Sequence, residues 1–100
     1  MPKFKAGVMH YSMAHELTKQ YSTIDEIHKR LVGRDAIITS AREGMHKRSS
    51  LHYQGKVIDL RTSDMGPGTP EEVVRELKNA LGFQFDVILE SDHIHVEYDP

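Results

Sequence analysis

The segment His93-Ile94-His95-Val96-Glu97-Tyr98 lies near the C-terminus and alternates polar with apolar side chains. Successive residues of a β-strand point to opposite faces, so Ile94 and Val96 would share one face while both histidines and Glu97 share the other. The alternation predicts a strand that is buried on one face and carries ionisable groups on the other.

A second segment, Val57 to Thr62, has the same design. Ile58 and Leu60 alternate with Asp59, which would point away from them. If the two segments pair in one antiparallel sheet, the Asp59 carboxylate and the two histidines of the C-terminal strand can converge on the same face.

The rest of the chain supplies helices and further strands. Helical spacing runs from Met9 to Leu17, a second helix is predicted from Thr23 to a stop at Gly33, and a third follows the cap Thr69 and ends at Gly82. Strands are predicted at residues 36–39 and 85–89, with a long polar loop at 41–56. These elements predict an α+β fold in which helices cover one face of a small antiparallel β-sheet and a polar site occupies the other.

Length and composition exclude several classes of protein. The 100 residues fit a single domain spanning 1–100, and the net charge of -2 argues against a general nucleic-acid binder. There is no cysteine, so neither disulfides nor thiolate zinc fingers are possible. No apolar run approaches the ~20 residues of a membrane span. The first residues lack the apolar core of a signal peptide.

Seven histidines and no cysteine mean that any metal must be held by His, Asp and Glu. His52 and Asp59 are seven residues apart, and they can meet only if the chain turns between them, which Gly55 allows. Catalytic zinc sites use three nitrogen or oxygen ligands plus water. His52, Asp59 and one histidine of the C-terminal strand make such a set, which leaves the other histidine and Glu90 to handle protons.

The pattern Ser50-x-His52-x-x-Gly55-x-Val57-x-Asp59 resembles the Ser-x-His-x-x-Gly-x-Ala-x-Asp signature of the zinc D-Ala-D-Ala carboxypeptidases and phage endolysin peptidases. Val57 stands where that family has alanine. These enzymes belong to the LAS metallopeptidases, which include murein endopeptidases and the zinc-bearing domain of hedgehog proteins. Residues 38–42 also resemble the family's strand and arginine turn, so the likeness covers roughly residues 36–98.

The resemblance implies an α+β LAS/hedgehog-like fold with one zinc ion held by His52 and Asp59. The segment around His95 is similar to the murein endopeptidase and hedgehog form, which makes His95 the third ligand and His93 a catalytic partner. In the carboxypeptidase branch, Glu-x-x-His would instead make His93 the ligand and Glu90 the base. We take His95 as the ligand.

Three residues are then expected to assist catalysis. Glu90 would serve as general base, His93 would act in proton transfer or in the transition state, and Arg42 would bind the oxyanion or a substrate carboxylate. Asp92 would either orient a histidine ring or form the turn before the last strand.

The resemblance implies a zinc peptidase that hydrolyses a stem peptide or cross-link of peptidoglycan, as a carboxypeptidase or an endopeptidase. Without a signal peptide, it would be made in the cytoplasm and act on the cell wall after release or as part of a phage particle. The alternatives are a catalytically inactive zinc-binding module and a phage structural protein of the same fold. Neither the oligomeric state nor the cleaved bond follows from the sequence.

Overall fold

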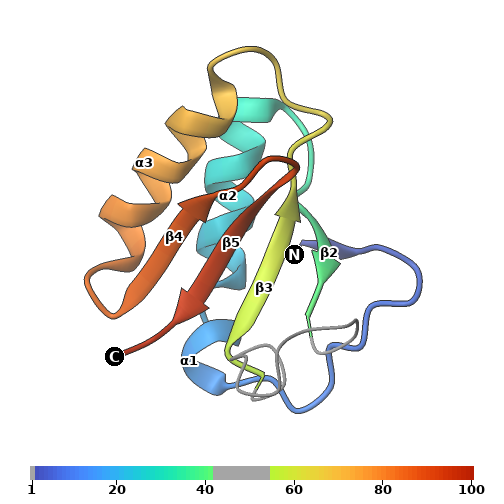
Figure 1. Ribbon diagram of the computed structural model, residues 1–100, viewed down its shortest axis with the longest axis vertical. Coiled ribbons are helices and arrows are strands. Elements are labelled where there is room, and N and C mark those ends of the chain that lie inside the picture. The colour runs from blue at the N-terminus through green and yellow to red at the C-terminus, as the bar shows by residue number, and fades with distance from the viewer. Residues whose placement is uncertain (1, 42–54) are drawn as a thin grey trace.

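A single five-stranded sheet organises the protein, and the computed structural model describes residues 2–41 and 55–100 (Figure 1). The strand order in the sheet is β1-β2-β3-β5-β4. The strands are β1 (Lys3–Phe4), β2 (Ile37–Ser40), β3 (Val57–Arg61), β4 (Phe85–Leu89) and β5 (His93–Tyr98). The four strands predicted from alternation and apolar runs are confirmed, with ends that differ by at most one residue.

The sheet is mixed, which corrects the prediction of a purely antiparallel sheet. β2, β3, β5 and β4 pair antiparallel in that order, whereas β1 pairs parallel to β2. β1 has only two residues, Lys3 and Phe4. A strand this short is too short to show the alternating pattern from which strands are predicted.

The register between β3 and β5 determines which side chains share a face. Asp59 pairs with His95, and its neighbours Ile58 and Leu60 pair with Val96 and Ile94. The four apolar side chains of these pairs are fully buried. Because the side-chain period of a strand is two, Asp59 and His95 lie together on the opposite face of the sheet.

Helices α2 (Tyr21–Val32) and α3 (Thr69–Leu81) lie side by side on one face of the sheet (Figure 1). α2 ends where predicted, because Gly33 adopts a left-handed conformation (φ 88°) and its N–H bonds to the Lys29 carbonyl. Within the described residues, no helix has both the length and the apolar character that crossing a membrane requires.

The helix predicted from Met9 is wrong over residues 9–14. The helix α1 covers only His15–Thr18. Ser12 has a φ of 50°, which a right-handed helix does not allow. The spacing of apolar residues has another origin, since Met13 packs against the core from an irregular segment.

The hydrophobic core fills the space between the sheet and the helices. Its fully buried members come from the sheet and from all three helices: Leu17, Ile24, Ile38, Ile58, Leu60, Val73, Leu77, Ile94 and Val96. Burial of this apolar surface is the main favourable contribution to folding. The helices therefore fix one face of β3 and β5, and this also fixes the direction of the polar side chains on the other face.

We expect Ile94→Ala to destabilise the protein by about 2–5 kcal/mol, because it leaves a cavity beneath the centre of β5. Chemical denaturation of the variant and the wild type measures the difference. Ile88→Ala is a control on the neighbouring strand, where the side chain is 47% exposed, and should change stability much less. Equal losses in the two variants would contradict the core described here.

Candidate metal centre

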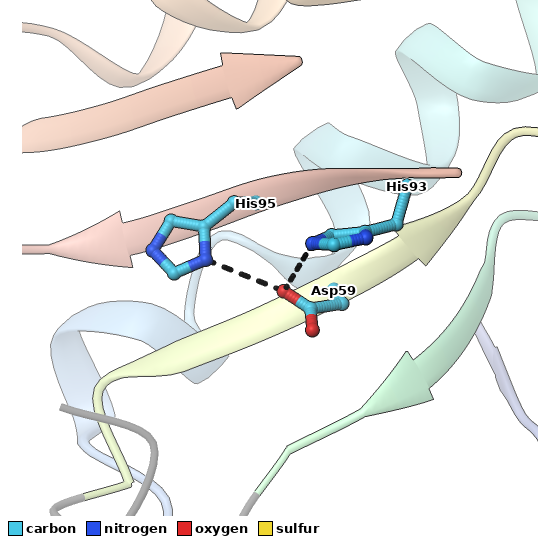
Figure 2. A group of neighbouring side chains, drawn as sticks. All are labelled: Asp59, His93 and His95. Carbon is cyan, nitrogen blue, oxygen red and sulfur yellow. Dashed lines mark ion pairs between the residues drawn. The ribbon is translucent and has the colours of Figure 1, made fainter. Parts of the chain in front are cut away.

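Asp59 lies at the centre of the sheet face opposite α2 and α3, and two histidines of β5 point towards it (Figure 2). Asp59 Oδ1 is 3.4 Å from His95 Nδ1 and 3.7 Å from His93 Nε2. His95 reaches Asp59 as its cross-strand partner, whereas His93 reaches it diagonally from the pair with Arg61. Asp59 is only 8% exposed, so its carboxyl group has little contact with solvent.

Each histidine also forms a hydrogen bond with a second carboxylate, through the ring nitrogen that points away from Asp59. The Asp92 Oδ1 atom lies 2.6 Å from His93 Nδ1, and the Glu97 Oε1 atom lies 3.0 Å from His95 Nε2. When these ring nitrogens donate their N–H to the carboxylates, the other nitrogen of each ring faces Asp59 with a lone pair. A carboxylate behind a ligating histidine is the usual outer partner at protein metal sites.

Without a metal, a proton on the His95 ring can take the position between the imidazole and Asp59. The Asp59 carboxylate raises the pKa of His95 from its ordinary value of 6.5 to about 9, and Glu97 adds to this effect while burial opposes it. The hydrogen bond from His93 lowers the pKa of Asp92. The group thus attracts positive charge, either as a proton on an imidazole or as a cation bound between the rings and Asp59.

The geometry fits a small divalent cation. One ligand atom from each of Asp59, His93 and His95 can be chosen so that all lie within 4.8 Å of one another. Ligands about 2.0–2.2 Å from a tetrahedral zinc ion are separated by about 3.3–3.6 Å. The distances of 3.4 and 3.7 Å from Asp59 to the two imidazoles are close to that separation. Imidazole and carboxylate donors suit zinc, although other transition metals accept them.

A cavity of about 360 Å³ opens beside this group. Asp59 and His93 form part of its wall, so the space adjoins the candidate ligands. The other lining residues are Lys5, Thr39, Arg61, Ser63 and Asp92. A small polar group can therefore enter next to Asp59 and His93.

The structure brings three of the six predicted site residues together: Asp59, His93 and His95. His52, which was expected to bind the metal together with Asp59, and Arg42 lie outside the described residues. The choice between the two histidines of β5 stays a prediction, because both have a ring nitrogen facing Asp59.

Glu90, the expected general base, directly follows β4, and its catalytic role stays a prediction. Its backbone N–H donates to the His93 carbonyl at the hairpin between β4 and β5, and its side chain is exposed. It does not line the cavity beside Asp59. Asp92 does line it and holds the His93 ring, which confirms the first of the two roles suggested for Asp92.

Sequence reasoning assigned no role to Glu97, Arg61 or Lys5. Glu97 had a usable signal, since it lies two residues after His95 and therefore on the same face of the strand. Arg61 likewise lies two residues after Asp59. Lys5 had none, because β1 was not predicted, and its approach to the site depends on β1 pairing with β2.

Comparison of the sequence with protein-family models found no match, and comparison with curated proteins found none either. The fold and the site define the protein as an α+β protein with a buried aspartate and two histidines that could hold a metal ion.

We expect the metal-free protein to lose stability as pH rises from about 6.5 through about 9, because the folded state raises the pKa of His95. The contribution of protonated His95 is complete below the lower value and disappears above the upper one. Denaturation of chelator-treated wild type and His95→Gln at about pH 6 and about pH 10 measures it relative to the variant. A stability difference that does not shrink at high pH would contradict the prediction.

We expect Asp59→Asn to weaken zinc binding by more than the roughly 10–100-fold that changes to outer partners cause, whereas Glu97→Gln should stay within that range. Asparagine removes the charge from the central ligand, while the glutamine still accepts a hydrogen bond from His95. Competition with a chromogenic chelator measures both affinities. Glu71→Gln, on exposed helix surface, is the matched control. Unchanged zinc affinity in Asp59→Asn would remove this residue from the ligand set.

Proposed function

We propose that the protein is a zinc-dependent hydrolase that cleaves peptide bonds of peptidoglycan. The observation that carries this proposal is the convergence of Asp59, His93 and His95 on one sheet face beside an open cavity. A structural zinc site is closed by four protein ligands, whereas a catalytic site keeps one position for water. Two ligands from β3 and β5, with His52 as the third, would leave that position open.

Asp59 and His95 are the best-placed ligands of the described residues. They are a directly opposed cross-strand pair, and both are anchored by strands whose other face lies in the core. Glu97 orients the His95 ring so that Nδ1 faces Asp59. A bound zinc ion would lower the pKa of a coordinated water towards ~7 and polarise a substrate carbonyl.

His93 is the residue best placed to move protons. Asp92 accepts the hydrogen bond from Nδ1, so the tautomer that results has an unprotonated Nε2 directed at the site. Such a nitrogen can accept a proton from water and return it to the leaving amine. The hydrogen bond also stabilises the imidazolium that forms between the two transfers. The pair of Asp92 and His93 supports this role more strongly than the exposed Glu90 does.

The choice of peptidoglycan rests on the resemblance of residues 50–59 to the signature of zinc peptidases that act on cell walls. The structure supports this choice in one respect. The site lies on the face of the sheet opposite α2 and α3 (Figure 1), and this is the face that an extended peptide substrate would have to approach. A stem peptide or cross-link of peptidoglycan is such a substrate.

One observation favours a second candidate, a zinc-binding module without turnover. Glu90, the base expected from the sequence, is exposed and does not line the cavity. In that case zinc would stabilise the fold through mass action and no peptide bond would be cleaved. The two candidates share a metal site and differ only in activity.

We expect the zinc-loaded protein to release amino groups from purified peptidoglycan, and a chelator to abolish the release until zinc is restored. His93→Ala should keep the metal and lose about 10²–10⁴-fold in rate, because it removes proton transfer. His15→Ala, which changes an exposed histidine on α1, is the matched control. Stable zinc binding with no release from any peptidoglycan would favour the inactive module, and release unaffected by chelation would exclude a metal mechanism.

A further inference from the structure

Two cations share the cavity that adjoins the candidate metal centre. Arg61 stands on β3 two residues after Asp59, on the same face of the strand and opposite His93. Lys5 enters from the end of β1, where its N–H donates to the Ile38 carbonyl on β2. Both side chains line the cavity of about 360 Å³ together with Asp59 and His93. The cavity therefore has positive charge within reach of the proposed reaction centre.

The acidic groups of the same cavity already contact histidines. Asp59 contacts both histidines, and Asp92 holds the His93 ring. Over residues 2–41 and 55–100, neither Lys5 nor Arg61 forms an ion pair with a carboxylate. If Asp59 binds a divalent cation, the charge of the cavity becomes still more positive.

Hydroxyl groups add hydrogen-bonding capacity to the two cations. Thr39 and Ser63 line the same space, and the Thr39 hydroxyl already bonds to the Asp59 carbonyl. Ser63 lies two residues after Arg61, at the turn that follows β3. A guanidinium, an ammonium and a serine hydroxyl around a small cavity suit a planar anion with two oxygens.

We propose that this cavity binds a carboxylate of the substrate, positioned within about one residue of the scissile bond because Asp59 and His93 form part of the same wall. The inference rests on the proposed hydrolase function and specifies its substrate. Arg61 supplies the directional contacts and Lys5 supplies charge. The carboxylate is either the C-terminus of a peptide or an acidic side chain next to the cleaved bond.

Two pairs of synthetic peptides distinguish these sources. In the first pair the C-terminus is a free acid or an amide, and in the second the residue next to the scissile bond is Glu or Gln. With the zinc-loaded full chain, we expect that in one of the two pairs the peptide with the carboxylate has a kcat/KM about tenfold or more higher than its uncharged counterpart. The pair that shows the preference identifies the source of the carboxylate.

Variants test whether the cavity causes the preference. Arg61→Gln should remove most of it, mainly by raising KM for the acid, while cleavage of the amide changes little. Lys5→Met should reduce it in part. Lys78→Met, an exposed cation on α3, is the control and should leave it intact. Equal cleavage of acid and amide by the wild type would overturn this inference and leave the hydrolase proposal standing.

A binding measurement separates this inference from the hydrolase proposal. N-acetylalanine and its amide are titrated into ¹⁵N-labelled protein, both zinc-loaded and zinc-free, and the signals of Arg61 and its neighbours are followed by NMR. Shifts with the acid alone that vanish in Arg61→Gln would support the carboxylate site even if no peptide is cleaved. No shift at Arg61 with the acid would count against it, whatever the activity.

Discussion

The antiparallel pairing of β3 with β5 is the constraint on which the site depends. It places a buried aspartate directly opposite a histidine and brings a second histidine to the same oxygen atom. A shift of one residue in the register would turn Asp59 into the core and both Ile58 and Leu60 out of it. The packing of the apolar residues against α2 and α3 thus also keeps the polar group assembled.

The polar group is arranged as a row of alternating carboxyl groups and imidazoles. Two outer carboxylates, Asp92 and Glu97, hold two imidazoles, and both imidazoles face the central carboxylate of Asp59. Three acids around two histidines attract positive charge, and the buried Asp59 at their centre is the place where a proton on His95 or a metal ion would supply it. The same arrangement therefore explains both the raised pKa of His95 and the fitness of the site for a divalent cation.

Sequence patterns predicted the strands well because alternation reflects burial on one face, as in β3 and β5. They also indicated that Asp59 and the two histidines could converge. They failed where the structure depends on contacts between distant segments. Met13 has helical spacing but packs on the core without a helix. Lys5 reaches the cavity only through the pairing of β1 with β2. A strand of two residues gives no sequence pattern from which this pairing could be predicted.

One feature of the topology bears on kinetic behaviour. β3 and β5 are neighbours in the sheet, but α3 and β4 separate them along the chain. An ion shared by Asp59 and His95 would close that long loop as a removable crosslink. Such an ion cannot bind tightly before the two strands have paired, so it would act late in folding and chiefly slow the unfolding rate. Resistance to proteolysis would then depend on the metal supply of the surroundings.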